Sequence, residues 1–152
     1  MSNKDNILYI CYNNSLRLNP YSIKEFVPAV RNATYCATVS VAYYEDFVAK
    51  LRKSFPRTGF KFIDLLAPCP ARWNFDTSNT IEIGRMITES FVWPLYEIDN
   101  GNVSVTKIPS NTDTVKRVFE ILKTAAPDDK IREIQDRVNK RWKALNEGRM
   151  IR

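Results

Sequence analysis

Three short stretches of the chain are almost continuously apolar, and each predicts a buried β-strand. They cover residues 7–12, 35–41 and 60–67, and the third is bounded by Gly59 and Pro68. Runs of this length are short for a helix and suit a strand, especially where β-branched and aromatic residues are frequent. Because strands that are apolar on both faces are typical of the interior of a parallel sheet, we predict that residues 7–12 form a central strand.

A helical pattern separates the second and third apolar runs. Within residues 45–55, the apolar residues Phe47, Val48, Leu51 and Phe55 recur at the spacing of an amphipathic helix. A strand, a helix and a strand in this order predict a βαβ unit with parallel strands and a right-handed crossover.

The second half of the chain predicts helices and a hairpin. Asp76 or Thr77 is expected to cap a helix that runs to about residue 91, and Asn100-Gly101 between two short alternating runs is typical of a hairpin turn. Further helices are predicted from about residue 113 to 125 and from about 128 to 147. The last helix carries an apolar stripe that we expect to pack on the core, and its members are Ile131, Ile134, Val138, Trp142 and Leu145.

Together these elements predict an α/β fold in a single domain covering residues 1–152: a mostly parallel sheet with flanking helices, then a hairpin and two helices. Between the first two strands, Pro20 and Pro28 leave room only for a short helix at residues 22–27.

With 44% hydrophobic and 26% charged residues, the composition is that of an ordinary globular domain. No apolar run is long enough to cross a bilayer and residues 1–6 are too polar for a signal peptide, so we expect a cytoplasmic protein without membrane contact.

Positive charge is concentrated at the end of the chain. Of the formal net charge of +6, the segment 130–152 contributes +5, from eight Lys or Arg residues against three acids. Such a segment could bind nucleic acid or an acidic protein. The commoner explanation is a solvated helix face with a basic end. The residues of the candidate partner face are Lys130, Arg137, Lys140, Arg141 and Lys143.

Candidate chemistry is limited to a few side chains. The chain has no histidine, and its three cysteines, Cys11, Cys36 and Cys69, are widely spaced. This pattern argues against a disulfide framework, a self-contained zinc site and a Cys-His nucleophile. Cys69 lies between two prolines in a loop after the third strand, where ligands bind in open α/β sheets. It could ligate iron or zinc, although a small buried apolar residue is the simpler interpretation.

A second candidate is the amide pair Asn13-Asn14 at the end of the first predicted strand. An amide oxygen beside a backbone carbonyl suits Mg²⁺ that carries a phosphate group. Asparagine at the end of a strand more often serves turn formation, so this pair alone is weak support for a metal site.

Taken in order, these residues resemble the thiamine-diphosphate-binding β subunit of pyruvate:ferredoxin and related 2-oxoacid:ferredoxin oxidoreductases. The resemblance covers the C-terminal half of such a subunit. The strings that carry it are residues 8–14, 35–42 followed by 45–47, 66–70 with Trp73, 80–84, 93–98, and Ile134, Gln135, Val138 and Trp142 near the end.

The resemblance implies a thiamine-diphosphate-binding-like fold without its N-terminal half. It also implies that Asn13, Asn14 and Leu16 line the cofactor, with Asn14 as a side-chain ligand of Mg²⁺ and Leu16 offering its carbonyl. Cys69 matches the fourth ligand of a [4Fe–4S] cluster. The chain departs from the family in having no Gly-Asp-Gly and no Cys-x-x-Cys, and it reads Asn-Pro-Tyr at residues 19–21 where Asn-Thr-Gly is usual.

Two functions follow. In the first, the chain is part of a 2-oxoacid:ferredoxin oxidoreductase and acts only with a partner chain that supplies the missing half. Thiamine diphosphate, Mg²⁺ and a [4Fe–4S] cluster are then shared with that partner chain. Other subunits of the complex and ferredoxin are further partners. In the second, it is a cofactor-free degenerate homologue that binds nucleic acid or an acidic protein. In both, the chain alone is expected to be inactive and to contain no catalytic residue of its own.

Overall fold

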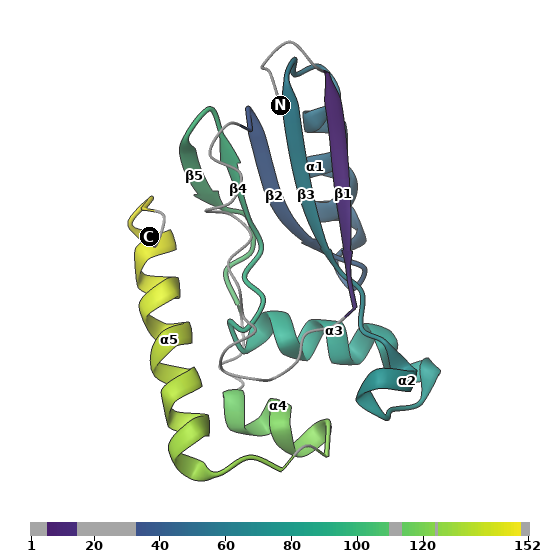
Figure 1. Cartoon of the computed structure of the whole chain (residues 1–152), viewed down its shortest axis with the longest axis vertical. Helices are drawn as coiled ribbons and strands as arrows, with labels where there is room; N and C mark the ends of the chain where they lie inside the picture. The colour runs from purple at the N-terminus through teal and green to yellow at the C-terminus, as the bar shows by residue number, and fades with distance from the viewer. Residues whose placement is uncertain (1–5, 15–32, 110–113, 124, 150–152) are drawn as a thin grey trace.

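The computed structural model describes residues 6–14, 33–109, 114–123 and 125–149, and Figure 1 shows their arrangement. The described strands form one sheet with the order β1 (Ile7–Asn13), β3 (Phe60–Leu66), β2 (Tyr35–Ser40), β4 (Tyr96–Asp99) and β5 (Asn102–Val105). The first three strands are parallel, and the β4–β5 hairpin joins β2 in the antiparallel direction. The predicted α/β fold with a parallel core is therefore confirmed.

Helix α1 (Tyr44–Ser54) connects β2 and β3 and covers one face of the sheet. Its inward residues Phe47 and Leu51 pack against Val39 and Ile63 of these strands, as their spacing predicted. Phe55, which follows the pattern but lies beyond the last helical residue, is 62% exposed, so its predicted inward position is wrong.

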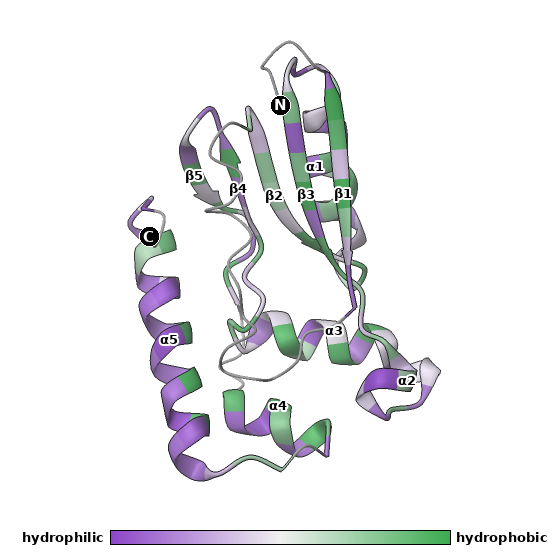
Figure 2. Cartoon of the chain, viewed as in Figure 1, coloured by the Kyte–Doolittle hydropathy of each residue, from purple (hydrophilic) through white to green (hydrophobic). Residues whose placement is uncertain are grey.

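A second core forms among three helices, α3 (Thr80–Glu89), α4 (Val115–Ile121) and α5 (Asp128–Asn146). Ile134 and Val138 of the predicted α5 stripe are buried there, and Leu145 packs separately against β2, β3 and β4. Figure 2 shows that the outward surface of α5 is hydrophilic. No described helix is both long enough and apolar enough to span a bilayer.

The approach of α3 to the sheet depends on one glycine. A Cβ atom added to Gly84 would lie 2.9 Å from the Cβ of Ala42, 3.5 Å from the hydroxyl of Ser40 and 3.7 Å from the ring of Pro68. The helix therefore rests directly on the end of β2 and on the loop that follows β3. Asp76 accepts a hydrogen bond from the backbone N–H of Ser78 and caps the 3₁₀ turn Thr77–Asn79 that precedes α3. The residue before α3 itself is Asn79, whose side chain makes no capping hydrogen bond, so Asp76 caps this turn and not the predicted helix.

Strand β1 lies at the edge of the described sheet, beside β3. It runs parallel to β3, as expected of a mostly parallel sheet, whereas its predicted central position is wrong. The side chains of Tyr9, Ile10 and Tyr12 are 55%, 42% and 66% exposed. An amino-acid pattern suited to the interior of a sheet thus stands on its border.

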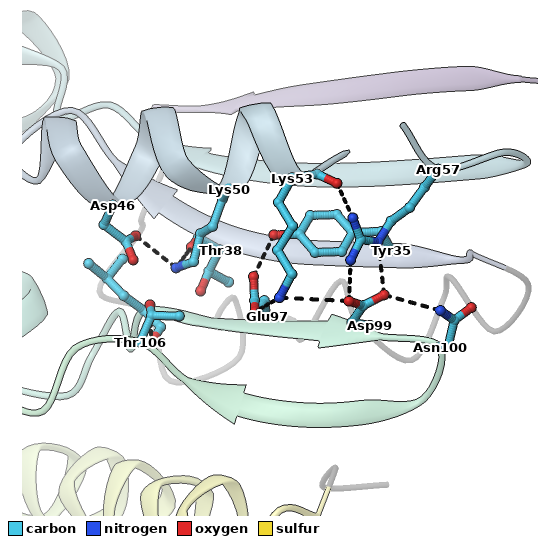
Figure 3. Close-up of polar contacts among 11 residues, drawn as sticks. Tyr35, Thr38, Asp46, Lys50, Lys53, Arg57, Glu97, Asp99, Asn100 and Thr106 are labelled. Atoms are coloured by element: carbon cyan, nitrogen blue, oxygen red, sulfur yellow. Dashed lines mark hydrogen bonds and ion pairs between the residues drawn. The ribbon is translucent and has the colours of Figure 1, made fainter. Parts of the chain in front are cut away.

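The predicted hairpin is confirmed. Asn100 and Gly101 both have positive φ angles, 48° and 86°, as a two-residue turn between antiparallel strands requires. A polar network, drawn in Figure 3, holds the hairpin to the sheet and to α1. The buried hydroxyl of Tyr35 donates to Glu97 at 2.7 Å, and the guanidinium of Arg57 binds both carboxylate oxygens of Asp99. This guanidinium holds the pKa of the Asp99 carboxyl below its usual value.

Other predictions concern residues outside the described ranges. These are the carbonyl of Leu16, the short helix at residues 22–27, and the start of the fourth helix at residue 113. In the described part, that helix begins at Val115 and is capped by Thr114, whose hydroxyl accepts from the backbone N–H of Arg117.

Candidate cofactor site at the carboxyl edge of the parallel strands

The two candidate segments leave the sheet side by side. In the register of β1 and β3, Asn13 lies opposite Leu66, and the N–H of Ala67 donates to the carbonyl of Asn13 at 3.0 Å. Asn14 therefore follows the last paired residue of β1, while the loop to Cys69 follows that of β3. This edge, at the carboxyl ends of parallel strands, is where open α/β sheets bind ligands.

Asp64 is a site residue that the apolar pattern concealed. It lies within β3, is 5% exposed, and accepts a hydrogen bond of 3.4 Å from the side-chain amide of Asn13. Burial raises the pKa of its carboxyl to about 6, and the Asn13 amide opposes this rise. The sequence feature that could have identified Asp64 as a site residue is the presence of a carboxylate inside a mostly apolar strand. Asp64 fixes the orientation of the Asn13 amide at the edge.

Cys11 lies opposite Asp64 on the neighbouring strand. Burial, and next the nearby Asp64 carboxyl, raises the pKa of the Cys11 thiol. Cys36 is buried in β2, and burial raises the pKa of its thiol to about 12. Cys36 belongs to a core cluster with Phe62 and Ile98, and the partly buried Cys11 packs against the same cluster, as small apolar residues do.

Cys69 has a different setting. It is half-buried and immediately precedes the short helix α2 (Pro70–Trp73), with its carbonyl accepting from the backbone N–H groups of Arg72 and Trp73 at 3.2 and 3.0 Å. Trp73 is part of the helical core and packs against Phe75. The thiol is therefore carried by a loop whose conformation is fixed by two prolines, a helical turn and a buried indole.

The donor atoms at this edge supply part of each implied site. A [4Fe–4S] cluster takes four thiolates, and Mg²⁺ takes octahedral oxygen ligands. Within the described ranges, no group of three or more His, Cys, Asp or Glu side chains is placed to hold a metal ion. Asn13, Asn14 and Cys69 fit the chemistry of these groups as single ligands, and the described residues do not complete either set.

The five basic residues of the candidate partner face on α5 differ in their surroundings: three are exposed and two have partners within the protein. Arg137, Lys140 and Lys143 are exposed. Lys130 pairs with Glu133 at 3.0 Å. Arg141 turns toward the protein, and its guanidinium donates to the carbonyl of Val92 at 2.8 Å and to that of Phe91 at 3.1 Å. The guanidinium of Arg141 thus ties α5 to the segment after α3.

The sequence of this chain is similar to those of several known proteins, although no protein-family model matches it. The chain is 35% identical to the pyruvate synthase subunit PorB of Methanocaldococcus jannaschii, over 78% of this chain and 41% of that subunit. It is 31% identical to PorB of Methanothermobacter marburgensis, over 91% of this chain and 60% of that subunit. The ketoisovalerate oxidoreductase subunit VorB of Pyrococcus abyssi is 43% identical over 59% of this chain and 28% of that subunit.

The chain thus spans about half the length of the PorB subunits that it matches. The resemblance predicted from the sequence strings is confirmed: the chain resembles the C-terminal half of the PorB subunit of pyruvate synthase and is similar to the VorB subunit of ketoisovalerate oxidoreductase.

Proposed function

We propose that this chain is the C-terminal half of a split 2-oxoacid:ferredoxin oxidoreductase subunit and acts only with a partner chain that supplies the other half. The observation that carries the proposal is the match of most of this chain to about half of each PorB subunit. The placement of Asn13, Asn14 and Cys69 at one sheet edge supports it, because a cofactor held between two halves needs ligands at such a border.

In the assembled enzyme, Asn14 would offer its amide oxygen to Mg²⁺, and Leu16 its carbonyl, while Asn13 lines the same site. Cys69 would hold one iron of a [4Fe–4S] cluster. Thiamine diphosphate, when bound, supplies the carbanion chemistry of 2-oxoacid decarboxylation, and ferredoxin would accept the electrons. The contribution of this chain is to bind and orient these groups, with Asp64 acting as a positioning residue for Asn13.

A second candidate is a cofactor-free protein that binds nucleic acid or an acidic protein. The observation that favours it is the exposed basic group Arg137, Lys140 and Lys143 on the outward side of α5, together with the incomplete donor sets at the sheet edge. Binding of nucleic acid by this face would weaken steeply as the salt concentration rises, because it would depend on phosphate contacts.

One experiment separates the two functions. The chain is isolated from its native source, and its visible absorbance, iron, magnesium and associated proteins are measured for the wild type and for Cys69→Ser and Asn14→Ala. The proposal expects a brown complex with a second polypeptide, loss of absorbance and iron in the first variant, and loss of magnesium in the second. Cys36→Ala is the matched control and should keep the cluster. A colourless protein that carries nucleic acid would overturn the proposal in favour of the second function.

A further inference from the structure

Among the described residues, the outer side of β1 carries backbone hydrogen-bonding groups that no strand pairs with. The N–H of Ile7 donates to Gly59 at 3.2 Å, and the carbonyl of Asn13 accepts from Ala67 at 3.0 Å, so odd-numbered residues of β1 face β3. Because peptide groups alternate along a parallel strand, those of Leu8, Ile10 and Tyr12 point away from β3. Among the described residues, β3 is the strand that pairs with β1.

Both faces of β1 are also incompletely covered. Ile7 and Tyr9 are exposed on one face and Ile10 and Tyr12 on the other, since side chains alternate along a strand. The ring of Tyr9 stacks on Phe62 at 5.8 Å and extends that apolar face outward. Natural edge strands are usually protected by charged residues or proline, and β1 contains neither. Its composition is that of an interior strand, but within the described ranges it has a neighbouring strand on one side only.

We infer that the outer edge of β1 is the docking surface for a polypeptide equivalent to the N-terminal half of the PorB subunit, which adds a strand beside β1 and covers both of its faces. This inference rests on the proposed function and deepens it. Its support is that this chain matches only about half of each PorB subunit, so that the unmatched half is large enough to supply a strand and helices together.

A second copy of this chain is a poorer occupant. Pairing of two β1 edges would satisfy the backbone groups and bring the partner copy's α1 near one face. The described helix that packs on the opposite face, α5, does so through Leu145 near Cys36, Phe62 and Ile98, mainly over β2 and β4. Figure 1 shows α5 at the side of the molecule away from β1. Edge-to-edge pairing would therefore leave Tyr9 without a covering layer.

The test uses the full chain co-expressed with the N-terminal half of PorB from Methanocaldococcus jannaschii, without added cofactors. Ile10→Pro removes an outward N–H while sparing the bonds to β3, and proline is tolerated at the edge of a sheet. Ile10→Thr keeps the N–H and the β-branched shape and is the matched control. Circular dichroism and thermal melting of each variant alone verify that the fold is kept. The two halves of the Methanocaldococcus jannaschii subunit, co-expressed as separate chains, verify that the fragment can assemble.

The expected result is a one-to-one complex of wild-type chain and fragment by sedimentation. Ile10→Pro should weaken it at least about tenfold, because it blocks strand pairing, and Ile10→Thr should weaken it less than about threefold. No complex, in an experiment where the subunit's own halves assemble, overturns the inference. So does a complex that Ile10→Pro leaves intact, or a dimer of the chain alone that Ile10→Pro dissolves. If the complex forms as expected but the native assembly holds no cluster, the proposed function fails and the docking surface stands.

Discussion

Replacement of Gly84 by alanine sets two effects of opposite sign against each other. Glycine inside a helix costs about 1 kcal/mol relative to alanine, so helix propensity alone predicts stabilisation. The new methyl group would, however, lie 2.9 Å from the Cβ of Ala42, well inside van der Waals contact. Ala42 is buried, and its Cβ is attached directly to the backbone at the end of β2, so relief requires movement of α3 or of the strand end.

Overpacking of this kind costs about 1–3 kcal/mol, so the clash outweighs the propensity gain. We expect Gly84→Ala to lower the free energy of unfolding by about 1 kcal/mol, and Tm by about 2–4 °C for each kcal/mol in a chain of this size. Urea and thermal denaturation followed by circular dichroism measure both quantities.

A double-mutant cycle isolates the clash. Ala42→Gly removes the atom that the new methyl group meets, so in that background Gly84→Ala should be neutral or stabilising by up to about 1 kcal/mol. Additive effects of the two substitutions, or a single Gly84→Ala variant that is more stable than the wild type, would refute the claim that α3 rests on the end of β2 through this glycine.

Two further predictions concern buried polar groups. The pKa of the Asp64 carboxyl is about 6 in the folded state and 3.8 in the unfolded state, so the free energy of unfolding falls as pH rises from about 4 to 6. The variant Asp64→Asn should remove this fall, which is on the order of 3 kcal/mol, when unfolding is measured at each pH. A difference between variant and wild type that is constant with pH would contradict this. Tyr35→Phe should cost about 1–2 kcal/mol because Glu97 loses a buried donor, whereas the half-buried Tyr43→Phe should cost less in the same denaturation assay. Equal losses would refute the role of burial.

Local patterns were sufficient for most elements of the fold. The three apolar runs became the three parallel strands, the 3.6-residue spacing of Phe47 and Leu51 gave α1, and Asn100-Gly101 gave the hairpin turn. The antiparallel pairing of β4 with β2 was not predicted, because pairing between distant segments leaves no local pattern in the sequence. The position of β1 was predicted wrongly, since a side-chain pattern reports that a strand suits the interior and says nothing of whether its neighbour is present.

The candidate site shows the same division. That Asn13 and Cys69 lie at the same edge of the sheet follows from the predicted parallel sheet, because the carboxyl ends of parallel strands share one edge. That β1 pairs directly with β3 is not contained in the βαβ pattern, which joins β2 and β3. The partnership of Asn13 with Asp64 could not be predicted, because Asp64 was counted within an apolar run and its burial depends on the packing of the whole sheet. Arg141 was likewise grouped with exposed basic residues, although its guanidinium donates to backbone carbonyls after α3. The position of a basic residue along a predicted helix does not tell whether its side chain is exposed to solvent or forms hydrogen bonds with another segment of the chain.

The outer edge of β1, which has no charged residue and no paired strand within the described ranges, has a consequence for the synthesis of this protein in the cell. An edge strand of mainly aromatic and aliphatic residues without proline or lysine can act as a template for uncontrolled sheet growth, so self-association through β1 would rise with concentration. Synthesis in step with whatever covers this border would keep the free concentration low, and excess chain would be a natural substrate for chaperones and proteases.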